Sequence, residues 1–165
     1  MSTIIRPFLG SDSESVLSLL KATRNFSAAE ISIAEELLGI SAQPLQQDYF
    51  AFVAVADAAD VIQGFVIIGP VPATAGTWNL YWIAVDPAHH GSGVADTLDS
   101  FAESFVRNRG GYWLLAETSS QPGYVRARGF YRKQGYLELA RIADYYKPSD
   151  DMIIYGKRLS VSQGH

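Results

Sequence analysis

The chain contains no cysteine. A thiolate nucleophile, a structural disulfide and a cysteine-based zinc site are therefore excluded, and any covalent chemistry would need serine, lysine or a carboxylate. The sequence also has no run of 18 apolar residues, and residues 1–10 lack the basic and then apolar pattern of a secretory signal. We therefore expect a cytoplasmic protein.

Positive charge is scarce. There are 13 Lys and Arg against 17 Asp and Glu, which gives a formal net charge of −4, and no run of five basic residues occurs. This charge balance argues against nucleic acid and anionic membrane surfaces as partners. The 165 residues are 48% hydrophobic and 12% aromatic, enough to build a core without a metal or a disulfide. We predict one domain over residues 1–165.

The apolar periodicity predicts an α/β (α+β) fold with a mixed central sheet and helices on both faces. The expected order is strand, two helices, three strands, helix, strand, helix and two strands. The strands are expected at 3–7, 49–56, 61–68, 78–85, 112–118, 136–142 and 152–159, and the helices at 12–24, 27–39, 93–109 and 122–134. A frayed tail is expected at 160–165.

Local signals set several of these boundaries. Asp12 or Ser13 is a candidate cap for the first helix, and Ser27 followed by Glu30 is a capping-box pattern for the second. Gly39 is expected to stop the second helix, and Gly135 to end the fourth helix in a left-handed conformation. A turn is expected at 147–151 between the last two strands.

The most informative segment is 85–95, with the sequence VDPAHHGSGVA, which joins a strand to a helix. Gly91 and Gly93 allow positive φ and a close backbone approach, and the first amides of a helix attract anions. A pyrophosphate would fit there, although a plain strand-to-helix connection has the same pattern. The dinucleotide pattern G-x-G-x-x-G fails because its third position is Asp96, and no Walker sequence occurs.

Residues 90–95 (HGSGVA) resemble the acyl-CoA pyrophosphate loop of the GNAT superfamily, Q/R-x-x-G-x-G/A, which follows a strand ending in V-x-P. His90 stands where the family usually has Gln or Arg. A second stretch, 127–136 (ARGFYRKQGY), is similar to the family's A-x-x-F-Y-x-x-x-G-[FY]. The family often has Asn seven residues before the tyrosine of this motif, where this chain has Tyr124. The predicted element order and the stretch 144–151 (DYYKPSDD) also resemble small bacterial members.

The resemblance implies an N-acetyltransferase that uses acetyl-CoA as co-substrate, with a small-molecule or peptide amine attacking directly in a ternary complex. A homodimer is left open. A non-catalytic acyl-CoA sensor is the rival function, because it would keep the glycine turn without needing a catalytic acid or base. The acyl-CoA contacts implied by the resemblance are Ile83, Ala84, Val85, His90, Gly91, Ser92, Gly93, Val94, Ala95, Tyr124 and Tyr131.

Acetyl transfer to an amine needs an acid for the leaving thiolate and a base for the amine. By motif position the acid is Tyr131, which could otherwise be a packing aromatic. The family's frequent glutamate is replaced by Tyr81, so no base carries over. Glu117, near the end of a predicted strand, is our candidate base, acting directly or through water. The alternative is a strand-end carboxylate held by a neighbouring donor.

His89 and His90 suggest a metal, but adjacent histidines in an extended turn point apart, and only Asp86 lies nearby. We therefore expect no metal. Ser92 would sit inside the anion loop, which does not fit a Ser-His-Asp triad. Substrate choice is expected to depend on the two N-terminal helices and on residues 143–151, where two adjacent tyrosines could line a substrate mouth.

Overall fold

The computed structural model describes residues 2–57 and 59–160. The predicted order of strands and helices is confirmed. The strands are β1 (Thr3–Pro7), β2 (Phe50–Ala56), β3 (Val61–Pro70), β4 (Thr77–Val85), β5 (Trp113–Ser119), β6 (Leu137–Lys147) and β7 (Asp150–Arg158), and the α-helices are α1 (Ser13–Thr23), α2 (Ala28–Ser41), α3 (Val94–Asn108) and α4 (Val125–Lys133). The strands form a mixed sheet in the order β1-β2-β3-β4-β5-β7-β6. The predicted tail beyond residue 160 lies outside the described residues.

The chain divides into two compact units. The first contains the residues up to Pro70 together with Tyr81–Ala102, and the second contains Val71–Leu80 and the residues from Glu103 onward. Both β4 and α3 therefore contribute residues to each unit.

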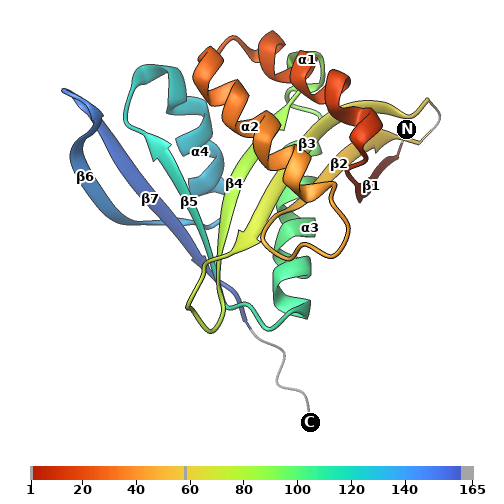
Figure 1. The fold of residues 1–165 in the computed structure, drawn as a ribbon. Helices are drawn as coiled ribbons and strands as arrows, with labels where there is room; N and C mark the ends of the chain where they lie inside the picture. The colour runs from red at the N-terminus through yellow and green to blue at the C-terminus, as the bar shows by residue number, and fades with distance from the viewer. Residues whose placement is uncertain (1, 58, 161–165) are drawn as a thin grey trace. The chain divides into compact units, whose positions relative to one another are not determined.

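In the first unit, helices cover both faces of the strands. Val53 and Val55 of β2 belong to a buried cluster with residues of α1 and α2. Phe52 points to the opposite face, where its ring meets that of Phe101 on α3 with centroids 4.7 Å apart. Because side chains alternate along a strand, β2 packs against a helical layer on each side. Figure 1 shows α1 and α2 on one side of β2 and β3, with α3 on the other.

In the second unit, β5 is the central strand. Thr77–Asn79 of β4 pair in parallel with Trp113–Leu115, and β7 pairs antiparallel with β5 on its other side. The strand β6 pairs antiparallel with β7. The helix α4 covers one face, since the Tyr131 ring stacks on Tyr155 of β7 with centroids 5.5 Å apart.

The predicted caps have mixed outcomes. The Ser27 hydroxyl accepts from the Glu30 amide at 3.1 Å and the Glu30 carboxylate accepts from the Ser27 amide at 2.6 Å, so the capping box is confirmed. Gly135 has φ of +89°, as predicted. Asp12 does not cap α1 with its side chain, because its carboxylate instead binds the Arg6 guanidinium and the Leu9 amide.

Other predicted boundaries were wrong. The helix α2 continues through Gly39 to Ser41, since glycine only weakens a helix whose apolar side is buried. The expected turn at 147–151 is shorter, because β6 runs to Lys147 and β7 already begins at Asp150. Within the described ranges, no helix is both long and apolar enough to cross a membrane.

Candidate active site

The glycine turn joins β4 to α3, as predicted. After Val85 a short 3₁₀ turn spans Pro87–His89, and Asp86 stabilises it by accepting from the Ala88 amide at 2.9 Å. Gly91 and Gly93 have φ of +76° and +85°. These values lie in the left-handed region that favours glycine. The chain thus enters α3 through two positions that disfavour other residues.

The geometry of the turn fits an anion. A Cβ built on Gly91 or Gly93 meets no atom within 4 Å among the described residues, so both backbone positions open onto free space. The first helical bond of α3 runs from the Thr97 amide to the Gly93 carbonyl at 3.0 Å. The amides of Val94 and Ala95 precede this bond and carry the positive end of the helix dipole. A phosphate can therefore approach the backbone closely.

The polar side chains of the turn hold the turn itself. The Ser92 hydroxyl donates to the His89 carbonyl, and the His90 ring Nε2 lies 3.1 Å from the Val85 carbonyl oxygen. Within residues 2–57 and 59–160, no three or more His, Asp or Glu side chains are grouped so that they could hold a metal ion. The backbone amides are then the groups of the turn best placed to bind a ligand.

Tyr131 occupies α4 within a cluster of aromatic rings. Its side chain is 6% exposed and packs against Tyr136, with centroids 5.3 Å apart, as well as against Tyr155 and Phe130. The end of α4 is fixed by a bond from the Tyr136 amide to the Tyr131 carbonyl at 2.9 Å. The position and orientation of the Tyr131 ring are thus set by three other rings.

Tyr131 and Glu117 do not share a face of the sheet. In the β5–β7 register, Ala116 pairs with Tyr155 and Glu117 pairs with Ile154. Paired residues point to the same side and neighbours alternate, so Tyr131 covers the Tyr155 face while Glu117 is exposed on the opposite one. An acid and a base at these positions would act from opposite sides of β5.

The pairing of β5 with β4 stops before Glu117. The parallel ladder covers Thr77–Asn79 on β4 and Trp113–Leu115 on β5. The part of β5 that carries Glu117 therefore lies beyond this ladder.

In the first unit, Tyr81 stands where the family's glutamate was expected. It is 36% exposed, and its ring meets the Tyr49 ring with centroids 5.3 Å apart. Burial, and then the neighbouring Tyr81, raise the pKa of the Tyr49 phenol. The Gln46 side chain fixes this segment by accepting from the amides of Asp48 and Tyr49, each at 3.0 Å.

Comparisons with known proteins decide the family. A family model described as "Acetyltransferase (GNAT) domain" matches residues 47–138, more than half of the chain. A crystal structure from Desulfovibrio desulfuricans, assigned to the GNAT family of acetyltransferases, is 33% identical in sequence to this chain and has a TM-score of 0.89. The alignment covers 96% of this chain and 100% of that chain. The chain belongs to the GNAT acetyltransferase family. The comparison with curated proteins gives no match.

More distant structures share the GNAT fold. The ribosomal-protein-S18-alanine N-acetyltransferase from Escherichia coli is 19% identical, with a TM-score of 0.77 and 99% and 98% of the two chains covered. An aminoglycoside 6'-N-acetyltransferase complexed with coenzyme A is 18% identical, with a TM-score of 0.74 and 94% and 96% covered. These two likenesses support the fold alone.

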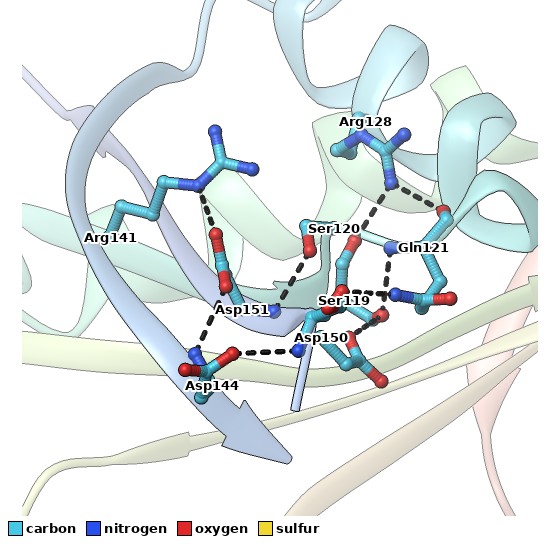
Figure 2. A network of polar contacts seen from close by, with 9 residues as sticks. Ser119, Ser120, Gln121, Arg128, Arg141, Asp144, Asp150 and Asp151 are labelled. Carbon is cyan, nitrogen blue, oxygen red and sulfur yellow. Dashed lines mark hydrogen bonds and ion pairs between the residues drawn. The ribbon is translucent and has the colours of Figure 1, made fainter. Parts of the chain in front are cut away.

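A polar network at the end of β5 in this GNAT chain was missed by sequence reasoning (Figure 2). Arg128 of α4 donates to the carbonyls of Ser119 and Gln121, both at 2.8 Å. The Ser119 hydroxyl donates to Asp150, which is only 8% exposed. Arg128 is an unspecified position of the second motif, so the motif gave no signal for it. The network fixes the segment that leads into Tyr124.

The network continues into the β6–β7 hairpin. Asp151 accepts from the Arg141 guanidinium at 2.8 Å and from the Asp144 amide at 3.0 Å, and its own amide donates to the Ser120 hydroxyl. The Asp144 amide, followed by Arg141, lowers the pKa of the Asp151 carboxyl. Residues 143–151 are therefore a hydrogen-bonded hairpin and not the loop that we expected.

Proposed function

We propose that this GNAT chain transfers the acetyl group of acetyl-CoA to a primary amine of a small molecule or peptide. The neutral amine nitrogen attacks the thioester carbonyl carbon, a C–N bond forms and the C–S bond breaks. The nitrogen loses one proton and the leaving sulfur gains one. The products are an N-acetyl amide and free CoA, and no covalent enzyme intermediate is needed.

The glycine turn carries this proposal. Gly91 and Gly93 adopt positive φ and open onto free space at the start of α3, which is the geometry that a pyrophosphate needs. Family membership supports the acyl-CoA reading over a generic anion site. We assign the remaining acyl-CoA contacts to Ile83, Ala84, Val85, His90 and Tyr124, as the family motifs imply.

Tyr131 and Glu117 are assigned the two proton transfers. A phenol with a typical pKa of about 10 is protonated at neutral pH and can donate to the thiolate sulfur. The carboxylate of Glu117 accepts the amine proton, directly or through water, from the opposite face of β5.

The rival function is a non-catalytic acyl-CoA sensor. It needs the glycine turn but neither an acid nor a base. The match to a family model described as an acetyltransferase domain favours catalysis over the sensor.

The test combines turnover with binding. Thiol release from acetyl-CoA is followed across a panel of monoamines, polyamines, aminoglycosides and peptides, while calorimetry measures acetyl-CoA binding to the same preparation. We expect binding together with amine-dependent thiol release, and mass spectrometry should identify the acetylated amine. Binding without release across the panel would favour the sensor, and absence of binding would remove the site itself.

A further inference from the structure

The strand β6 is an exposed edge. It is the last strand in the sheet order, and every residue from Leu137 to Lys147 is exposed. The exposed fractions of its large apolar side chains are 69% for Leu137, 46% for Leu139, 45% for Ile142, 53% for Tyr145 and 48% for Tyr146. An exposed edge strand with apolar side chains is a template for pairing with another strand.

A β-bulge sorts the side chains of this edge by chemistry. The register with β7 shifts between Glu138 and Ala140. It pairs Leu137 with Gly156, Glu138 with Tyr155, Arg141 with Ile153 and Ile142 with Met152. Since paired residues share a face and β7 alternates, Glu138 and Arg141 point to the Tyr155 face, while Leu137 and Ile142 point to the other. Without the bulge, Glu138 and Arg141 would lie on opposite faces.

Leu139 joins the apolar face. A Cβ built on Gly156 would lie 2.3 Å from Leu139 and 2.9 Å from Leu115, so these two side chains meet over Gly156. Tyr131 and α4 cover the opposite face. Within the second unit, the exposed edge therefore has an apolar side and a charged side.

This segment is complementary to itself. In an antiparallel pairing about a two-fold axis between Leu139 and Ala140, Glu138 of one copy lies opposite Arg141 of the other, and Leu137 lies opposite Ile142. Both pairs then share a face, as a two-fold axis perpendicular to the sheet requires. We propose that β6 binds a second copy of this chain by antiparallel pairing of Leu137–Ile142.

The charge pattern selects a second copy over other partners. The pairing of two copies contains two contacts between the oppositely charged side chains of Glu and Arg, and two contacts between large aliphatic side chains. Arg141 also binds Asp151 through its Nε, yet its side chain is 50% exposed, which leaves the guanidinium reachable from the edge. Charged edge residues usually oppose self-pairing, but here their signs favour it.

Sedimentation velocity of the full chain tests this pairing. We expect a dimer for the natural sequence. Glu138→Arg alone and Arg141→Glu alone each place like charges opposite each other twice, so each should weaken the dimer about tenfold or more. An equimolar mixture of the two variants restores opposite charges at both contacts and should recover a heterodimer. Glu35→Arg, an exposed charge reversal on α2, is the matched control and should stay dimeric.

Each remaining result counts against the pairing. A natural chain that stays monomeric at high concentration, or a dimer that survives Glu138→Arg, would overturn it. Two monomeric variants whose mixture also stays monomeric would overturn this register. Thermal unfolding checks that each variant is folded, because Arg141→Glu also loses the bond to Asp151. If that variant does not fold, Glu138→Arg alone decides: a folded monomer supports the pairing, and a folded dimer overturns it.

Discussion

Replacing Tyr131 by Phe removes one hydroxyl and keeps the ring. The ring is 6% exposed and lies against Tyr136 and Tyr155 with centroids 5.3 and 5.5 Å away. Phenylalanine fills the same volume, so these ring contacts persist and the fold should be retained. Any loss of rate then reports on the hydroxyl.

The expected loss follows from the role assigned to the phenol. General acid catalysis by a positioned group contributes about 10²- to 10⁴-fold in rate. We expect kcat of Tyr131→Phe to fall by about a hundredfold or more, which corresponds to about 2.7 kcal/mol of transition-state stabilisation. The Michaelis constant for acetyl-CoA should change little, because the proton is donated mainly in the transition state.

The matched control is Tyr155→Phe, in the ring stacked on Tyr131. The Tyr155 hydroxyl is buried and has no hydrogen-bond partner among the described residues. Its removal should leave kcat nearly unchanged and leave the thermal transition unchanged or higher. Both variants are assayed by thiol release on a verified amine, under conditions where chemistry limits the rate. Equal kcat for Tyr131→Phe and the natural protein would show that Tyr131 is only a core aromatic.

Three further predictions concern the glycine turn and the N-terminal ion pair. Gly93→Val should abolish acetyl-CoA binding in calorimetry while the fold persists, because valine opposes the φ of +85° and fills the space that a phosphate needs. Gly39→Val in α2 is the control. Unchanged acetyl-CoA affinity in a folded Gly93→Val variant would refute the site. His90→Arg should hold or raise acetyl-CoA affinity, since added positive charge favours phosphate, whereas a large loss would show that the imidazole has a specific role. Arg6 holds the pKa of the Asp12 carboxyl below its usual range in the folded protein. The contact between Arg6 and Asp12 therefore stabilises the fold fully above the unfolded-state pKa of about 3.9, and this stabilisation is lost as the pH falls through the pKa of Asp12 in the folded protein. In urea unfolding, the free energy of unfolding of Asp12→Asn should be about 1–3 kcal/mol lower than that of the natural protein at neutral pH, and this difference should shrink in acid. A difference that stays constant with pH would contradict the assigned pKa shift of Asp12.

The sequence predicts what depends on neighbouring residues. The capping box of Ser27 and Glu30 and the positive φ of Gly91 and Gly93 are local, and the structure has all of them. Asp12 was misread for the opposite reason. Its carboxylate binds Arg6 at 2.8 Å, a partner on β1 that helical periodicity does not consider. A cap signal specifies a residue type, whereas a cation on another element can take the same side chain.

The same distinction explains the candidate site. The family motifs located the glycine turn and Tyr131, because each motif encodes a backbone conformation or a position within one element. They gave no sign that Glu117 and Tyr131 face opposite sides of the sheet, since that depends on how β5 is registered with β7. A register is a property of two strands, and a shift by one residue would move Glu117 to the Tyr131 face. The proton-transfer roles therefore depend on a pairing that neither motif contains, which is why Glu117 needs its own test. Glu117→Gln keeps the size of the side chain and removes its basicity, so kcat should fall at pH values where the carboxylate is ionised. The difference from the natural protein should shrink in acid, where neither side chain is a base. A pH–rate profile unchanged from that of the natural protein would show that water alone takes the amine proton.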